Sequence, residues 1–286
     1  MRPWLYGACA AFLLGCGSVG DADERFSYGG PQPAPIDIGS AAALVDASRA
    51  RVFVVDAPTG APQVRIVPVG RNPVTQVARK SGNGLLVLTH GNPTTSGKPE
   101  SPALWIVPAL ATETPRAIPL ASRFTGVSQS DDGRWVILSF TDNKQQGDLL
   151  FNPNELAIID LQAPQPTVVT RTIRSLGSVP RSIVFSPRMM LTDGPRTLAV
   201  IASDSYLTLL DLDNLTRPEI TVPLTLEGDG RRLLAREVLF DAAGASLYVR
   251  VAGVTDIYGL ALVPVPAAER TTPNDFRPAL SLLAAG

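Results

Sequence analysis

The sequence has a single histidine, His90, and only two cysteines, Cys9 and Cys16. A Ser-His-Asp triad would have to use His90, and the Gly-x-Ser-x-Gly turn that presents the nucleophile of α/β-hydrolases does not occur. One histidine and so few thiols also exclude a typical zinc site, which takes most of its ligands from these residue types. The sequence therefore predicts no metal and no cofactor, and it offers no evident catalytic centre.

An excess of charge of one sign is also lacking. The chain has 25 basic and 26 acidic residues among 286, which gives a formal net charge of -1. This balance argues against a strongly electropositive nucleic-acid-binding protein. Hydrophobic residues make up 45% of the chain, which is enough to build a core, so a fully disordered chain is excluded as well.

The most apolar segment is too short to cross a membrane. It runs from Trp4 to Gly15 after the single positive residue Arg2, and a spanning helix needs about 20 residues. This order of charge, apolar run and small residues is typical of a secretory signal peptide. Leu13-Leu14-Gly15-Cys16 resembles the lipobox of bacterial lipoproteins, in which the final cysteine is acylated and the chain is cut before it. The alternative is an ordinary signal peptide whose apolar run contains cysteine.

The lipoprotein resemblance implies that residues 1–15 are removed and that Cys16 carries the lipid. Cys9 is then lost with the signal peptide, so no intrachain disulfide can form, and the acyl chains anchor the protein to a bilayer. Gly17, in place of Asp after the acylated cysteine, favours the outer membrane by the same resemblance. Residues 16–35 lack periodicity and end in Gly and Pro, which predicts a flexible tether. The folded domain is expected over residues 36–286.

Proline and glycine are abundant, at 26 and 24 residues, and they separate short apolar segments. Five of these segments look alike and end at positions 56, 108, 160, 211 and 264, at spacings of 52, 52, 51 and 53 residues. They are too short, and too often bounded by proline, to be helices, so each is predicted to be a strand. The five are Arg51–Asp56, Leu104–Pro108, Leu156–Asp160, Leu207–Asp211 and Leu260–Pro264.

A strand, a polar turn and another strand precede each of the later segments, and a further strand follows several of them. The strand pairs are Val74–Ala78 with Leu85–Thr89, Phe124–Val127 with Trp135–Phe140, Ser182–Phe185 with Leu198–Ala202, and Glu237–Phe240 with Leu247–Val251. Four strands in about 50 residues are the repeating unit of a β-propeller blade. The prediction is an all-β chain with about five four-stranded blades. A β-sandwich is the competing fold, but it gives no reason for the period.

The first and last repeats do not decide whether the propeller forms a closed ring. Ala279–Gly286 matches Glu237–Gly244 in pattern, so the chain is expected to end on an innermost strand. Either this strand completes the first blade and clasps the ring, or the ring is incomplete or truncated. Ala42–Val45 is expected to be the second strand of the first unit. A rival register pairs Leu44–Ala47 with Leu239–Ala242 and makes that unit an incomplete blade.

The segments between blades resemble a known repeat family. Val67–Val74 and Leu176–Pro187 are similar to the blade junctions of YVTN-type propeller repeats, which occur in bacterial surface proteins and are related to lactonase-like propellers. Ser130–Gly133 supplies the corresponding hairpin turn. Leu88–His90 and Ser139–Asn143 stand where Tyr-Val-Thr-Asn would fall, and neither reproduces it. The resemblance implies a propeller fold and a cell-envelope context, but no particular activity.

Candidate binding residues cluster in two loops that are expected at the rim. His90 follows a predicted strand and precedes the long loop Gly91–Pro102. Two further long loops, Thr141–Pro153 and Arg188–Pro195, are expected to belong to the same contact surface. Loops on a rigid scaffold commonly carry binding function. The predicted rim contacts are His90, Asn92, Lys98, Asp142, Asn143 and Asp148.

Several acidic residues have simpler explanations than metal binding. The segment Asp142–Asp148 collects oxygen ligands but lacks the alternating acids and the final Glu of an EF-hand, so a solvated loop is expected. Asp56, Asp160 and Asp211 recur at the ends of equivalent strands. They are predicted to accept hydrogen bonds from the backbone of the turn that follows.

Two functional classes fit these observations. The first is a non-catalytic, lipid-anchored propeller of the cell envelope that binds a protein or glycan partner. The alternative is a lactonase-like hydrolase, with carboxylates and arginines converging on the central channel. The first class fits the few ionisable residues better, and a cluster of such residues in the channel would favour the second.

Overall fold

The computed structural model describes residues 34–57, 60–92, 99–141, 152–174, 180–191, 194–204, 206–224, 234–244, 246–252, 255, 257–269 and 276–284. Pro35–Gly286 form one compact unit, distinct from Met1–Ala34. The predicted signal peptide, Cys16 and the tether up to residue 33 lie outside the described residues, and so do Lys98, Asp142, Asn143 and Asp148.

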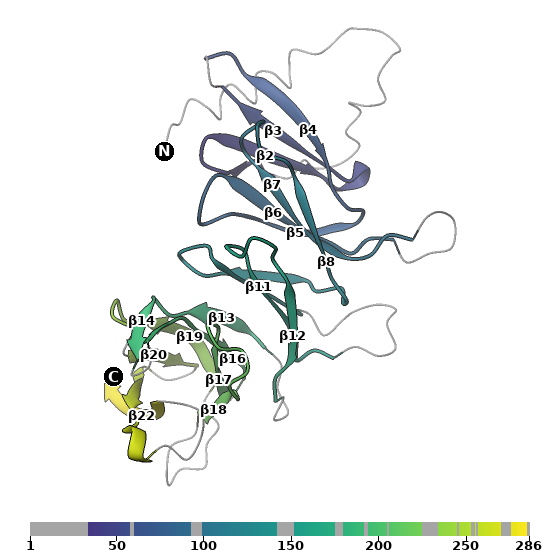
Figure 1. Ribbon diagram of the computed structural model, residues 1–286. Helices are drawn as coiled ribbons and strands as arrows, with labels where there is room; N and C mark the ends of the chain where they lie inside the picture. The colour runs from purple at the N-terminus through teal and green to yellow at the C-terminus, as the bar shows by residue number, and fades with distance from the viewer. Residues whose placement is uncertain are drawn as a thin grey trace, which may run out of the picture. The chain divides into compact units, whose positions relative to one another are not determined.

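The described residues form five four-stranded antiparallel sheets that follow one another along the chain (Figure 1). Sheet 1 contains β1 (Ile36–Asp37), β2 (Ala41–Asp46), β3 (Arg51–Asp56) and β4 (Gln63–Pro68). Sheet 2 contains β5 (Pro73–Ala78), β6 (Gly84–Thr89), β7 (Ala103–Pro108) and β8 (Arg116–Pro119). Sheet 3 contains β9 (Gly126–Gln129), β10 (Trp135–Ser139), β11 (Glu155–Asp160) and β12 (Val168–Thr172).

Sheet 4 contains β13 (Ser182–Phe185), β16 (Leu198–Ala202), β17 (Tyr206–Asp211) and β18 (Ile220–Pro223). Sheet 5 contains β19 (Ala235–Phe240), β20 (Ser246–Val251), β21 (Ile257–Pro264) and β22 (Phe276–Ala284). A two-stranded ribbon, β14 (Met189–Leu191) with β15 (Gly194–Arg196), lies between β13 and β16 in the sequence, where the sequence predicted a long loop without strands. In the described part of the chain, two short 3-10 helices cover Ala47–Arg49 and Ala267–Glu269. No helix long and apolar enough to span a membrane occurs among the described residues.

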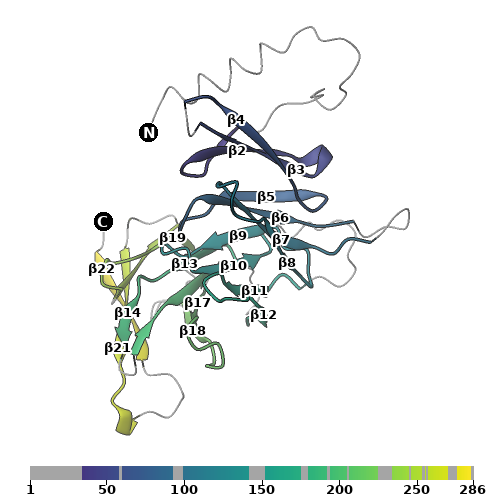
Figure 2. The ribbon, with the colours of Figure 1, turned by 45° about the horizontal axis from the view of Figure 1, so that its top comes forward.

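The first strands of successive sheets lie side by side, in the order β1, β5, β9, β13 and β19. Figure 2 shows the last four of these strands next to one another. Each sheet is a meander in which strand order follows the chain, apart from the inserted ribbon in sheet 4. Repeated four-stranded meanders whose first strands adjoin are the blades of a β-propeller. The predicted fold class is therefore confirmed.

The sheets pack face to face through four hydrophobic clusters, one for each consecutive pair of sheets. The middle strands of sheets 2, 3 and 4 are apolar on both faces because both faces are covered, as β6 and β10 illustrate, with every residue buried. This packing explains the nearly continuous apolar runs in the sequence. The five repeated segments fall in β3, β7, β11, β17 and β21, as predicted.

The expectation that the last strand clasps the first blade is wrong. β22 pairs with β21 over its whole length, from Ile257↔Ala284 to Pro264↔Phe276, and is the fourth strand of its own sheet. The first position of sheet 1 is filled by the short strand β1, which pairs with β2. β2 is consequently a second strand, so the rival register for Leu44–Ala47 is also wrong. The apolar pattern at the C-terminus did not reveal which sheet it would join, because an inner strand and an outer strand can share that pattern.

Candidate functional site

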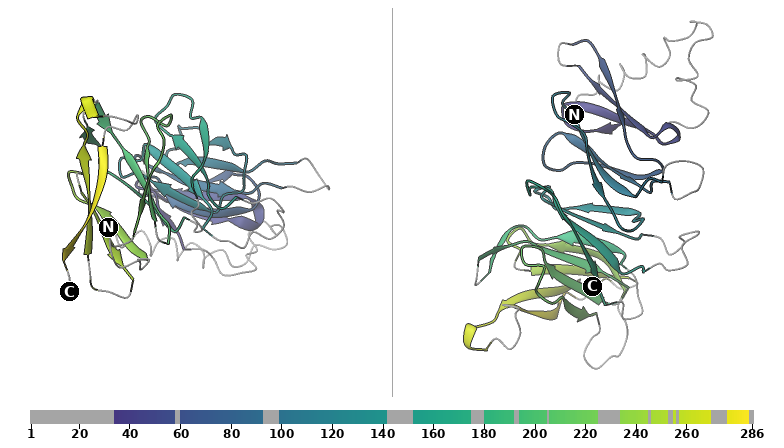
Figure 3. Two further views of the ribbon diagram at one scale, coloured as in Figure 1. Left: turned by 90° about the horizontal axis from the view of Figure 1, so that it is seen from below. Right: turned by 45° about the vertical axis from the view of Figure 1, so that its right-hand side comes forward.

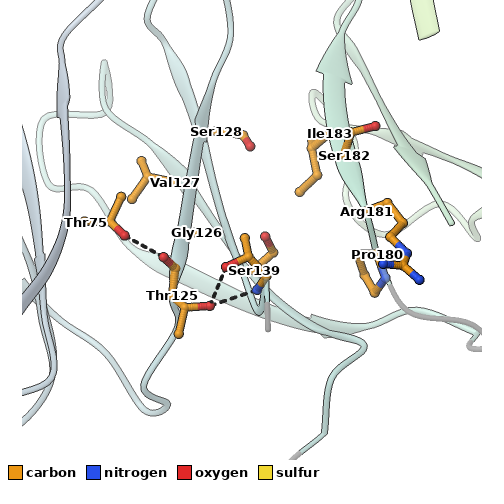
Figure 4. A pocket seen from close by; sticks show the side chains of 11 residues that line it. Thr75, Thr125, Gly126, Val127, Ser128, Ser139, Pro180, Arg181, Ser182 and Ile183 are labelled. Carbon is orange, nitrogen blue, oxygen red and sulfur yellow. Dashed lines mark hydrogen bonds between the residues drawn. The ribbon is translucent and has the colours of Figure 1, made fainter. Parts of the chain in front are cut away.

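A cavity of about 340 Å³ lies where the first strands of sheets 2, 3 and 4 come together. One wall comes from the start of β9 and the end of β10, and the facing wall comes from the residues that lead into β13 (Figure 4). Its lining consists of Thr75, Thr125, Gly126, Val127, Ser128, Ser139, Thr141, Pro180, Arg181, Ser182 and Ile183. The size is at the lower end of the range for ligand pockets.

Hydrogen bonds of threonine hydroxyl groups connect the strands that line this cavity. Thr75 Oγ1 donates to the carbonyl oxygen of Thr125 over 2.6 Å and so ties β5 to the start of β9. Thr125 Oγ1 accepts the backbone N–H of Thr141 at 2.8 Å and lies 3.0 Å from Thr141 Oγ1. These hydroxyl groups therefore hold the wall together.

Glycine is required at the start of β9. A Cβ at Gly126 would lie 2.5 Å from Cγ2 of Thr141 and 3.2 Å from Oγ of Ser139. The close approach of β9 to the end of β10 depends on the missing side chain. Gly126 thus keeps the serine wall tightly packed.

The serine hydroxyl groups differ from the threonines. Within the described part of the chain, Ser128 and Ser139 make no side-chain hydrogen bond. Figure 4 shows Ser128 on the β9 wall and Ile183 across the gap. Each hydroxyl can donate one hydrogen bond and accept two. The β9–β10 wall therefore presents hydrogen-bonding groups that the described structure does not use.

The facing wall combines the apolar side chains of Pro180 and Ile183 with the hydroxyl group of Ser182 and one cation, Arg181. Pro180 and Ile183 supply carbon surface. Arg181 Nε donates to Asp204 Oδ1 at 2.8 Å, and both side chains are well exposed. Its hydrogen bond to Asp204 raises the pKa of Arg181 above the usual value. Arg181 is thus charged and already paired.

His90 takes a structural role beside this region. Its Nε2 donates to the carbonyl oxygen of Phe124 at 2.8 Å, and its backbone N–H donates to the carbonyl of Asn72. Phe124 is buried against Phe140, with ring centroids 4.8 Å apart. His90 therefore joins sheet 2 to the entry of sheet 3, and it is not among the residues that line the cavity.

The second described rim candidate, Asn92, forms a backbone bridge with Glu100 and is partly buried. Glu100 Oε1 accepts the backbone N–H of Arg71 at 3.2 Å. Asn92 thus closes the base of its loop and does not line the cavity. The other predicted rim contacts, Lys98, Asp142, Asn143 and Asp148, lie outside the described residues, so their role stays a prediction.

The turn prediction is confirmed for two of the three repeated aspartates. Asp160 Oδ1 accepts the N–H of Gln162 at 2.9 Å, and Asp211 Oδ1 accepts the N–H of Asn214 at 3.0 Å. The described contacts of Asp56 are the strand pairings with Ala41 and Gln63.

The same two aspartates also belong to an ionic cluster that the sequence did not predict. We call this cluster the charged seam; it consists of Arg134, Asp160, Asp213, Arg196, Asp211 and Arg217. Arg134 binds Asp160 of its own sheet at 2.9 Å and Asp213 of sheet 4 at 2.7 Å. Burial alone would lower the pKa of Arg134, but these two hydrogen-bonded carboxylates raise it.

The second half of the charged seam is more deeply buried. Arg196 Nη1 donates to Asp211 Oδ2 at 2.8 Å, and Arg217 lies 3.6 Å from the same oxygen. The side chains of Arg196 and Asp211 are only 9% and 4% exposed. Burial raises the pKa of Asp211, against the opposing effect of Arg196 and Arg217.

The charged seam and the cavity are at opposite ends of the same strand. Arg134 immediately precedes β10, and Ser139 is its last residue. Five residues of strand separate them by about 16 Å. The clustered carboxylates and arginines therefore do not line the cavity. Among the described residues, no group of three or more His, Cys, Asp or Glu side chains is placed to hold a metal ion.

The sequence matches no known protein family, and no curated protein is significantly similar to it. Among solved structures, it is similar to hydrazine synthase of Kuenenia stuttgartiensis, with 17% identity and a TM-score of 0.45 over 78% of this chain and 62% of that chain. It is also similar to a functionally unknown protein from Desulfotomaculum acetoxidans, with 13% identity and a TM-score of 0.47 over 80% and 65% of the two chains.

A third similar structure is the periplasmic gluconolactonase PpgL of Pseudomonas aeruginosa, with 16% identity and a TM-score of 0.40 over 81% and 63% of the two chains. The chain spans less than two thirds of each of these three structures. Likeness at this level gives no information about what the chain binds.

Proposed function

We propose that this protein is a non-catalytic β-propeller binding module, and that its cavity holds an uncharged, hydroxyl-rich group such as a sugar residue of a glycan. The observation that carries the proposal is the pair of serine hydroxyl groups, Ser128 and Ser139, that find no hydrogen-bond partner within the described part of the chain. A polar group that lines a pocket and is not used by the fold is available to a ligand.

The chemical groups that line the cavity favour a sugar over a charged ligand. A sugar ring has hydroxyl groups at its edge and C–H groups on its faces. The cavity offers the hydroxyl groups of Ser128 and Ser139 on one wall, and carbon surface from Pro180 and Ile183 beside the hydroxyl group of Ser182 on the other. Its one arginine is already paired with Asp204. A free anion would find little uncompensated positive charge.

The lactonase-like alternative gains no support from this lining. Hydrolysis of a lactone needs a general base or a metal to activate water. The residues that line the cavity carry hydroxyl, apolar and guanidinium groups, and none carries a carboxylate, imidazole or thiol. The carboxylates that cluster with arginine belong to the charged seam, at the other end of β10.

The cell-envelope setting is part of the proposal and rests on the N-terminal sequence. An exported chain acylated at Cys16 would keep the propeller at a membrane surface, where envelope glycans are concentrated. Labelling with a fatty-acid analogue in the native host tests the anchor. We expect incorporation in the wild type and none in Cys16→Ser. Equal incorporation in both would show that Cys16 does not carry the lipid.

Glycan binding can be tested with an array of bacterial surface glycans, followed by calorimetry with the strongest hit. Ser128→Trp places a large side chain in the cavity and should weaken binding at least about tenfold. Thr170→Trp is the matched control, because Thr170 is exposed on β12, the outer strand of the same sheet. The proposal fails if no glycan binds, or if Ser128→Trp binds as well as Thr170→Trp.

A further inference from the structure

Arg181 lies at the edge of the cavity. It is one of the lining residues, and its side chain is 63% exposed. Figure 4 shows it beside Pro180, across the gap from Ser139. Arg181 immediately precedes β13, and its backbone N–H donates to the carbonyl oxygen of Ala202, the last residue of β16, over 2.8 Å. The pairing of β13 with β16 therefore fixes the backbone of Arg181 at this edge.

Asp204 holds the guanidinium group of Arg181. It belongs to the turn between β16 and β17, which the N–H of Ser203 closes by donating to the carbonyl oxygen of Tyr206 at 2.9 Å. Its two carboxylate oxygens accept from Nε and Nη2 of Arg181 at 2.8 and 3.4 Å. Such a two-point contact orients the planar guanidinium as well as binding it. Asp204 does not line the cavity, so its effect on a ligand passes through Arg181.

This ion pair combines hydrogen-bond donors with a neutralised charge. A guanidinium has five N–H donors, and Nη1 takes no part in the described pairing with Asp204. The positive charge of Arg181 is compensated by a carboxylate oxygen 2.8 Å away. Arg181 can therefore donate hydrogen bonds without presenting an uncompensated charge. This combination suits a sugar hydroxyl group and does not suit an acid.

We propose that Arg181 binds sugar hydroxyl groups at the edge of the cavity, and that Asp204 makes the site select neutral sugars over acidic ones. The inference rests on the proposed function, which is the binding of a sugar in this cavity. Without the Asp204 carboxylate, the guanidinium would be an exposed and unneutralised cation beside the ligand. It would then attract the carboxylate of a uronic acid, because arginine pairs strongly with carboxylates.

A similar ion pair on sheet 5 provides a control. Arg250 Nε donates to Glu237 Oε2 at 3.0 Å, and the two side chains are 62% and 49% exposed, compared with 63% and 38% in the first pair. Sheet 5 is the yellow part of Figure 3. Val249 and Val251, on either side of Arg250, pack in the cluster shared with sheet 4. Arg250 therefore lies on the other face of sheet 5, and neither member of this pair lines the cavity.

Calorimetry with matched sugars tests the inference, at low ionic strength because salt screens exposed charges. The probes are glycosides of glucose, galactose and mannose, each paired with the uronic acid that carries a carboxylate at C6. The wild type should bind the neutral sugar of a pair more tightly than the acid. Asp204→Asn should shift the ratio of the two affinities toward the acid by about threefold or more. Arg181→Gln should weaken binding of the neutral sugar severalfold.

Glu237→Gln is the matched control, because it changes the net charge by the same amount and releases Arg250 from an equivalent pair. It should leave both affinities unchanged, and circular dichroism melting would verify that all variants fold. The inference alone is overturned if the wild type binds sugars but favours the uronic acid, or if Asp204→Asn leaves the ratio unchanged. An equal shift in Glu237→Gln overturns it as well. A wild type that binds no sugar contradicts the proposed function, and this inference with it.

Discussion

The charged seam and the serine-lined cavity occupy the two ends of β10, and they differ in how their polar groups are used. In the seam, each carboxylate is bound by arginine: Asp160 and Asp213 by Arg134, and Asp211 by Arg196 and Arg217. In the cavity, the described structure leaves the hydroxyl groups of Ser128 and Ser139 unused. The clustered ionisable side chains of the charged seam therefore connect sheets 3 and 4. The cavity at the other, less charged end of β10 is the better candidate for a binding site.

The largest effect on stability is expected when one buried charge is removed from the charged seam. Asp211→Asn leaves Arg196 and Arg217 without their shared carboxylate, and breaking a buried pair in this way costs roughly 3–5 kcal/mol. We expect about 3 kcal/mol in the free energy of unfolding, because the substitution also relieves the burial penalty on Asp211. Urea unfolding measures this loss. A loss below about 1 kcal/mol would mean that the seam does not hold sheet 4 together.

The half-buried part of the seam should matter less. Arg134→Met removes the contacts to Asp160 and Asp213 and the stacking of the guanidinium over Trp135, whose centroid lies 4.5 Å away. We expect a loss of about 2 kcal/mol, since hydrogen bonds to charged groups contribute roughly 1.5–3 kcal/mol. Urea unfolding of Arg134→Met beside Lys80→Ala provides the contrast. The side chain of Lys80 makes an exposed ion pair with Asp131, which contributes about 0–1 kcal/mol.

Asp46 lies outside both the charged seam and the cavity. It tests whether a hydrogen-bonded carboxylate contributes to the stability of the fold in another part of the protein. Burial alone would raise the pKa of Asp46, but hydrogen bonds from Ser48, Arg51 and Arg49 bring it below the usual 3.8. Because the folded-state pKa is depressed, the stabilisation is complete above the unfolded value and is lost as pH falls through the folded value. The advantage of the wild type over Asp46→Asn, about 1 kcal/mol, should persist from pH 7 to about pH 5 and shrink below 3.8. Urea midpoints measured across this range check it; an advantage that grows in acid would contradict the assignment.

The smallest expected change in stability is at the cavity. Ser128→Ala removes a hydroxyl group that the described structure does not use, so the free energy of unfolding should stay within about 0.5 kcal/mol of the wild type. Glycan affinity should fall severalfold in the same variant, since a neutral hydrogen bond is worth about 1 kcal/mol. Thr125→Val is the contrasting variant, because Thr125 Oγ1 accepts the N–H of Thr141. If Ser128→Ala were as destabilising as Thr125→Val, the serine would be structural and the comparison would fail.

Much of the fold could be predicted from the sequence because the strands of a blade can be recognised from short stretches of sequence. Segments such as Leu156–Asp160 are short, apolar and evenly spaced, and those properties are sufficient to place a third strand in each sheet. The pairing of β22 could not be predicted in the same way. Its partner depends on which sheet edge is free, and an apolar pattern does not report this.

The candidate site was harder to predict for a related reason. Ser128, Ser139 and Ile183 are ordinary residues in ordinary strands, and only the packing of sheet 3 beside sheet 4 brings them to one cavity. His90 attracted attention because it is the single histidine, yet its imidazole binds a backbone carbonyl. A rare residue stands out in a sequence, whereas a shared hollow between distant strands has no local signature.

The pairing of β22 with β21 also bears on how the chain acquires its structure. Each sheet is completed by strands that are close in sequence, and no described strand of the last sheet is needed to finish the first. Contacts of short sequence separation form quickly, because little loop entropy is lost in closing them. A chain synthesised from its N-terminus can therefore complete sheet after sheet in order, so that sheet 1 does not wait, unpaired and prone to aggregate, for the strands of sheet 5.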